Sequence, residues 1–195
     1  MTAVDGGSLA ALFVTNVLNG TVAAGGSVVN GGTVVRLLLF IPNNHPPRLL
    51  ESKIVASGFP ERTDSAALVI GPTGVAFDDA TGNLYVADSL KNRIAAIPGA
   101  LFRSDSAGVG YTVSQGGALN DPLGLALAPD HHILTANGND GNIVETSPLT
   151  GKQVAVKLVD NTGAPPGSGA LFGLIAASDG VYFVDDASNT FNLLH

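Results

Sequence analysis

The chain has 195 residues, of which 45% are hydrophobic and 13% charged, and it contains no cysteine. That length is enough for a substantial core, and the lack of cysteine excludes disulfides, thiol nucleophiles and thiolate-bound metals. The formal net charge is −7 and the lysines and arginines are scattered. We therefore expect no nucleic-acid partner, because such a partner requires clustered positive charge.

The hydropathy pattern indicates no membrane partner either. The longest apolar run, at 37–41, is far shorter than the ~20 residues that a spanning helix needs. The first ten residues lack the basic and apolar segments of a secretory signal. The sequence leaves the compartment unknown, and we favour an extracytoplasmic location, periplasmic or secreted, for a longer parent protein.

In chain order, the first predicted unit covers about residues 1–70. It begins with the end of one strand and a second strand, both within 2–16, joined by a turn at an Asp-Gly-Gly sequence. The glycine-rich stretch 23–32 is predicted to be an inserted loop. Further strands are expected at 32–41 and at 48–59, the second of which is the outer strand of the unit.

The second unit, at about 71–120, has the clearest pattern. Short apolar segments at 74–77, 84–87 and 93–97 alternate with turn residues, which predicts three consecutive strands. The segment 108–115 is expected to be the outer strand.

Two further units follow, at about 121–168 and 169–195. The third unit repeats the pattern of the second and ends with strands predicted at 142–148 and 152–159. The fourth is expected to be incomplete, with its third strand at 191–195 and no outer strand.

The units are related by a regular spacing. Gly74, Gly124 and Gly173 open the first strands and lie 50 and 49 residues apart. Such self-similarity is typical of propellers and solenoids, and units of four short antiparallel strands are typical of propeller blades. The predicted fold is all-β: a β-propeller of four-stranded antiparallel blades, with about three and a half blades in an open arc.

The residues P-x-G-V-A-F…G-N-L-Y-V-A-D-S…N-R-I at 72–94 closely resemble an NHL repeat, and 122–143 is a weaker match. NHL proteins are usually six-bladed propellers, so the resemblance implies a six-bladed type of which this chain is an N-terminally incomplete segment. It implies function poorly, because such propellers include binding modules as well as lactonase-like and lyase enzymes.

The candidate site residues lie where the second strand of each unit ends and in the loop that follows. These loops are expected to gather on one face near the axis, where carboxylate and amide oxygens would suit Ca²⁺. The candidates are Asn16, Asp88, Lys91, Asn92, Arg93, Asn137, Asn139, Asp140, Asp185 and Asp186.

A structural interpretation competes with this functional one. The residues that end the second strands are Asn16, Asp88, Asn137 and Asp185, one in every unit. An Asx side chain at the start of a loop commonly binds its own backbone two residues on, and a feature present in every unit is expected to serve the unit itself.

Other catalytic and metal patterns are lacking. The four histidines, His45, His131, His132 and His195, show no H-x-H or H-E-x-x-H spacing, and no P-loop or G-x-S-x-G sequence occurs. We predict no catalytic residue and no protein-bound metal, although Ca²⁺ remains possible as a cofactor.

The favoured function is a non-enzymatic NHL-like binding or scaffold module whose partner is an unknown small molecule or protein. The alternative is a lactonase- or lyase-like enzyme with a divalent metal in the central channel. Self-association through open blade edges is also expected, since unpaired strand edges favour it.

Overall fold

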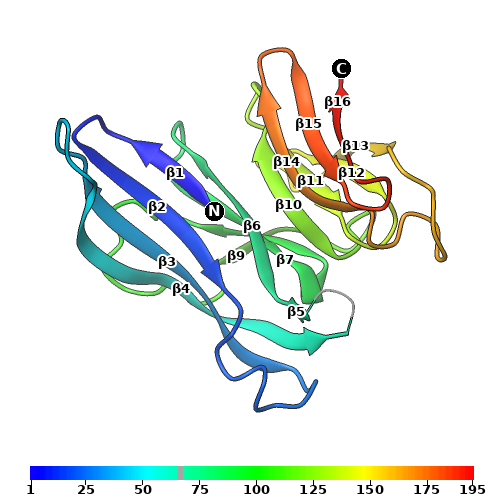
Figure 1. Cartoon of the computed structure of the whole chain (residues 1–195), viewed down its shortest axis with the longest axis horizontal. Helices are drawn as coiled ribbons and strands as arrows, with labels where there is room; N and C mark the ends of the chain where they lie inside the picture. The colour runs from blue at the N-terminus through cyan, green and yellow to red at the C-terminus, as the bar shows by residue number, and fades with distance from the viewer. Residues whose placement is uncertain (66–67) are drawn as a thin grey trace.

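The computed structural model describes residues 1–65 and 68–195. Four antiparallel sheets follow one another along the chain, as the colours of Figure 1 show. Within the described residues the only helix is one 3-10 turn, η1 (Ser89–Lys91), and none is long and apolar enough to span a membrane. The all-β propeller predicted from the sequence is confirmed.

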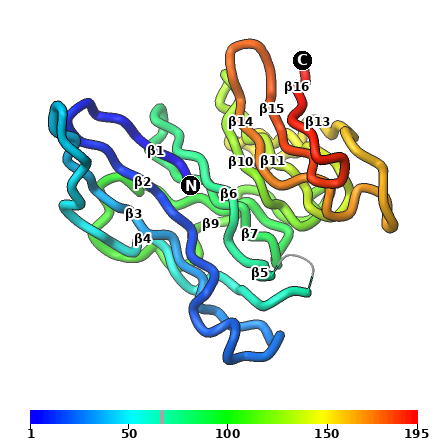
Figure 2. Tube along the Cα trace, in the orientation of Figure 1, coloured from blue at the N-terminus to red at the C-terminus, as the bar shows by residue number. Residues whose placement is uncertain are grey.

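The first sheet has the strand order β1-β2-β3-β4-β5. Its strands are β1 (Thr2–Asp5), β2 (Leu9–Asn16), β3 (Val29–Phe40), β4 (Arg48–Asp64) and β5 (Leu68–Ile70). Because β3 begins at Val29, the predicted loop at 23–32 was placed too late, and part of it pairs with β4 instead. The loop that does extend from this sheet covers 17–28, and Figure 2 traces it away from the other sheets.

The other sheets keep the order of the chain. The second contains β6 (Pro72–Asp78), β7 (Asn83–Asp88), β8 (Arg93–Ile97) and β9 (Tyr111–Gln115). The third contains β10 (Pro122–Leu127), β11 (Ile133–Asn137), β12 (Asn142–Thr146) and β13 (Gln153–Leu158). The fourth has three strands, β14 (Leu171–Ala177), β15 (Gly180–Asp185) and β16 (Thr190–Leu194).

The core lies between successive sheets. Alternate residues of β7 point to opposite faces, as the period of two requires, so Leu84 and Val86 pack against the first sheet. Tyr85 and Ala87 pack against the third sheet, in a second apolar cluster with Ile133. Each inner sheet therefore buries both faces, and the continuous apolar runs of its strands follow from this position.

The repeated glycines allow the inner strands to approach one another. A Cβ at Gly74 would collide with the backbone of Leu123, and one at Gly124 with the backbone of Phe172. β6, β10 and β14 therefore pass one another closely at these positions, which accounts for two of the three repeated glycines. Gly173 has no atom within 4 Å of such a Cβ, because no further sheet lies against it.

Candidate functional site

Asp88 and Arg93 form a buried ion pair at the predicted loop face. They are opposite each other at the ends of β7 and β8, and Asp88 Oδ2 accepts hydrogen bonds from Arg93 Nε at 3.0 Å and Nη2 at 2.8 Å. Arg93 also donates to the carbonyl of Val109 and to Thr112 Oγ1. This arrangement differs from the Asx turn predicted for Asp88, because Asp88 makes no side-chain hydrogen bond to the backbone of η1.

The pair borders a polar cavity of about 440 Å³ between the first and second sheets. Lys91, which is exposed, lies at the same cavity, so the structure brings three of the predicted site residues together. The lining residues are Asn30, Gly58, Pro60, Asp88, Lys91, Arg93, Val109, Thr112 and Gln115.

The electrostatics of this polar cavity follow from its burial. Asp88 is fully buried and its Oδ1 has no hydrogen-bond partner. Burial raises the pKa of the Asp88 carboxyl, and the hydrogen bonds and charge of Arg93 oppose the shift without cancelling it. With Asp88 ionised, the two basic side chains leave one net positive charge at the cavity.

Two asparagines among the candidates bind the segment between β9 and β10, which joins the second and third sheets. Asn92, in the left-handed conformation, accepts a hydrogen bond on Oδ1 from the amide of Asp121 at 2.7 Å. Asn137 donates to the carbonyl of Ala118 and to Asp140, and accepts from the amide of Asn120. For Asn137 the predicted Asx turn is therefore wrong, although both side chains have structural roles.

The remaining candidates lie outside the polar cavity. Asn16 does form the predicted Asx turn, accepting from the amide of Leu18 at 3.2 Å, and Asp185 accepts from the amide of Ser188 at 3.1 Å. Asn139 and Asp186 are exposed. None of these four residues lines the polar cavity.

Glu61 was not among the candidates expected from the sequence. It is fully buried near the C-terminal end of β4. Neither of its carboxylate oxygens has a hydrogen-bond partner, and a Cβ at Gly31 or Gly71 would touch its side chain. Burial raises the pKa of Glu61, and the nearby backbone amide of Asn19 opposes this in part. In the sequence Glu61 opens a polar run that continues with Arg62 and Thr63, so nothing there indicated its burial.

Two groups of side chains that could hold a metal were also missed. Asp78, Asp79 and His131 form one group, and Asp130, His132 and Glu145 form the other. His132 Nδ1 lies 2.6 Å from Glu145 Oε1, and this hydrogen bond raises the pKa of His132. The aspartates and histidines of both groups lie at the β6–β7 and β10–β11 turns, and Glu145 lies in β12. These turns are at the opposite ends of β7 and β11 from Asp88 and Asn137.

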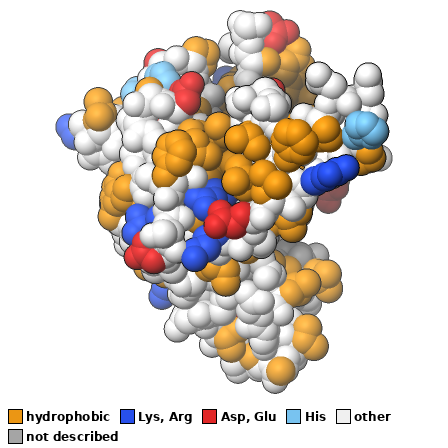
Figure 3. Space-filling view, turned by 90° about the vertical axis from the view of Figure 1, so that its left-hand side faces the viewer, with side chains coloured by type: hydrophobic (Ala, Val, Ile, Leu, Met, Phe, Trp, Pro, Cys, Tyr) orange, Lys and Arg blue, Asp and Glu red, His pale blue; other side chains and the backbone are white. Residues whose placement is uncertain are grey.

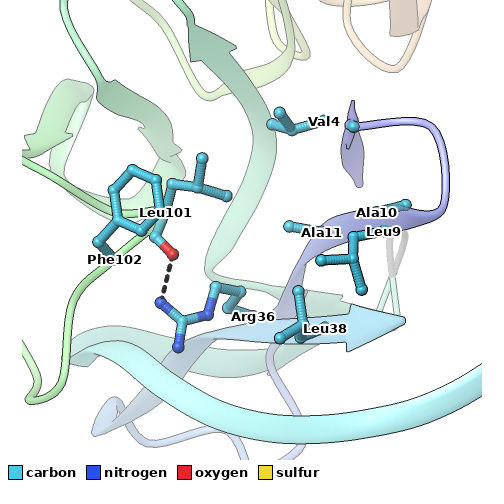
Figure 4. Close-up of a pocket in the computed structure, with 9 residues that line it drawn as sticks. Val4, Leu9, Ala10, Ala11, Arg36, Leu38, Leu101 and Phe102 are labelled. Carbon is cyan, nitrogen blue, oxygen red and sulfur yellow. Dashed lines mark hydrogen bonds between the residues drawn. The ribbon is translucent and has the colours of Figure 1, made fainter. Parts of the chain in front are cut away.

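A second cavity, also of about 440 Å³, is mostly apolar. Figure 4 shows Arg36 beside it, with the guanidinium directed at the carbonyl of Leu101, 2.6 Å away. The same guanidinium binds two further carbonyls and Glu51. Besides Gly6 and Arg36, the lining residues are Val4, Leu9, Ala10, Ala11, Leu38, Leu101 and Phe102.

The cavity bordered by the inner strands has a different character. It measures about 360 Å³ and draws its lining from β5, β6, β10 and β14 together with Met1. Among the described residues that line it, Thr73 is the only one with a polar side chain. No carboxylate or imidazole from the described part of the chain lines this space.

Comparison with known proteins defines the class of this chain at the level of fold. No family model matches it, and no curated protein matches its sequence. A nidogen/laminin complex contains a chain with a TM-score of 0.50 and 13% identity, covering 94% of this chain and 70% of that one. β-propellers are thus the structural relatives, and at this identity the likeness concerns the fold alone.

Two enzymes show a weaker likeness. Virginiamycin B lyase from Staphylococcus aureus has a TM-score of 0.46 at 12% identity, covering 95% of this chain and 74% of the lyase. PQQ-bound aldose sugar dehydrogenase from Streptomyces coelicolor has a TM-score of 0.48 at 14% identity, covering 91% of this chain and 55% of the dehydrogenase. Neither likeness carries information about the activity of this chain.

Proposed function

We propose that this chain is a non-enzymatic propeller binding module of the NHL type, whose ligand occupies the polar cavity beside Asp88 and Arg93. The observation that carries the proposal is the meeting of Lys91 with this buried pair at one cavity. The apolar cavity is a weaker candidate, because Arg36 is its only lining residue with a polar side chain and its guanidinium is already bound to Glu51 and to backbone carbonyls.

The lining chemistry indicates the class of ligand. Lys91 supplies an exposed ammonium group that forms no salt bridge with any residue the structure describes. The neutral groups of Asn30, Thr112 and Gln115 can donate or accept hydrogen bonds. Asp88 is bound to Arg93 through Oδ2 alone, and the pair supports these groups from the wall of the cavity. A small polar molecule with a single carboxylate, such as a sugar acid or an acidic side chain of a peptide, matches this lining.

Calorimetric titration with a sugar acid and with the corresponding neutral sugar tests the proposal. We expect the acid to bind and the neutral sugar to bind at least tenfold more weakly, because it cannot pair with Lys91. Lys91→Met should remove this preference while keeping the apolar stem. Lys157→Met, on an exposed position of β13, is the matched control and should change nothing.

Equal binding of both sugars, or a preference that survives Lys91→Met, would contradict the proposal for this cavity.

The enzymatic alternative requires a divalent metal in the central channel. The apolar lining of the inner cavity supports the binding module over that alternative. Titration with Ca²⁺ and Zn²⁺ tests the alternative when it is done on the wild type and on a variant with Asp78→Asn and Glu145→Gln, which weakens both turn groups. A channel metal would bind equally to both proteins.

A further inference from the structure

The first and fourth sheets each leave one apolar face uncovered. On the fourth sheet, the pairing of β14, β15 and β16 places five side chains on the face that points away from the third sheet. We call this the back face, and its residues are Ile175, Tyr182, Val184, Phe191 and Leu193. On the first sheet, the side that points away from the second sheet is the front face, with Leu12, Val14, Val35, Leu37 and Ile54.

Inside the molecule, equivalent back-face positions are buried by the next sheet. Ala76 and Ala87 of the second sheet are 7% and 0% exposed, because the third sheet covers them. The residues at the same repeat positions in the fourth sheet, two repeats later, are Ile175 and Val184, which are 61% and 43% exposed. The residues are larger in the fourth sheet and lack a cover.

Front-face positions show the same relationship. Leu84 and Val86 of the second sheet are fully buried because the first sheet covers them. Leu12 and Val14 hold these positions in the first sheet and are only partly buried. Everywhere else in the molecule a back face packs on the front face of the following sheet, so the two uncovered faces are of complementary kinds.

The total surface shows how much area is left uncovered. A folded monomer of 19.6 kDa is expected to expose about 8,600 Å². This chain exposes 9443 Å², roughly 840 Å² more than that expectation. The excess is similar to the roughly 800 Å² that each partner buries in a standard interface. Figure 3 shows hydrophobic side chains gathered on the side of the molecule that carries the first sheet.

We propose that the partner for these faces is a second copy of this chain, with the back face of each copy packed on the front face of the other. Two such contacts close a dimer with twofold symmetry, and each contact repeats the sheet stacking found within the chain. None of the ten named side chains is charged, so their burial carries no charge-desolvation cost. Asp5, which pairs with Ala10, lies on the edge strand of the front face and is exposed.

Sedimentation velocity on the full chain tests this arrangement. The wild type should sediment as a dimer, and Phe191→Asp and Ile54→Asp should each sediment as a monomer. Both side chains are exposed in the single copy, at 68% and 48%, so the variants should keep their circular dichroism spectrum. Leu149→Asp, which lies outside both faces and is 92% exposed, is the control that should remain dimeric.

Mixing the two monomeric variants makes the test specific. One intact back face and one intact front face are then available, so the mixture should form a dimer with weakened affinity. A wild type that stays monomeric, or that grows beyond a dimer, would overturn the proposal. So would a dimer that either variant alone leaves intact, or a mixture that remains monomeric, because both results would place the contact on other surfaces.

Discussion

Asp88 and Arg93, five residues apart, form an ion pair in which the carboxylate is fully buried and the guanidinium side chain is 8% exposed. Two hydrogen bonds join the guanidinium to a single carboxylate oxygen. The pair holds the end of β7 to the start of β8 and supports the polar cavity.

Asp88→Ala should lower the free energy of unfolding by about 3–5 kcal/mol, because it leaves the Arg93 guanidinium buried without its partner. Asp140→Ala, which removes hydrogen bonds at a less buried turn, should cost only about 0.5–1.5 kcal/mol. Chemical denaturation measures both. The double variant Asp88→Leu with Arg93→Met should lose less unfolding free energy than Asp88→Ala alone. Equal losses for Asp88→Ala and Asp140→Ala would contradict the importance of the buried pair.

Glu61 should make stability depend on pH. Burial raises its pKa in the folded protein above the ordinary value of 4.5, so the folded state holds the proton more tightly than the unfolded state. The free energy of unfolding should therefore fall as the pH rises from about 4.5 through the raised pKa of the folded state.

Glu61→Gln should remove this fall and make the protein more stable than the wild type at neutral pH. Urea denaturation at a series of pH values measures the effect. Asp105→Asn, at a largely exposed carboxyl, is the control and should leave the profile unchanged. Identical profiles for Glu61→Gln and the wild type would show that burial does not perturb this carboxyl.

The repeated glycines should differ in their tolerance of alanine. Gly124→Ala should cost about 1–3 kcal/mol of unfolding free energy, since the new methyl group would meet the backbone of Phe172. Gly173→Ala should be tolerated because the space around it is open. Thermal unfolding of the two variants, measured side by side, checks this prediction. An equal loss of unfolding free energy in both would contradict it.

The hydrogen bond between His132 and Glu145 should be visible in the titration of the imidazole. It raises the pKa of His132, so Glu145→Gln should bring that pKa back toward 6.5. The stabilisation from this pair is complete below pH 6.5 and disappears as the pH rises through the raised pKa. NMR titration of His132 in both proteins checks this, and an unchanged midpoint would contradict it.

The local pattern of the sequence determined most of the fold. The alternation of apolar residues predicted the strands of the second and third sheets, and the repeat marked by Gly74, Gly124 and Gly173 predicted their grouping into blades. Period-two burial acts through short segments and is visible as alternation. The close approach of inner strands joins different sheets, but it requires a glycine at the same place in successive units and so is visible as a repeat. The early start of β3 was missed because glycine-rich strand ends resemble loops in sequence.

The partners of the polar side chains depended on the tertiary structure. The sequence marked Asp88 and Asn137 as equivalent. In the structure Asp88 pairs with an arginine, whereas Asn137 donates a hydrogen bond to the backbone carbonyl of Ala118, between the second and third sheets. Likewise, His132 meets Glu145 only because β11 and β12 lie side by side. Strand alternation specifies which residues are buried, whereas the partner of a buried charge is decided by the register and packing of sheets that the local pattern does not encode.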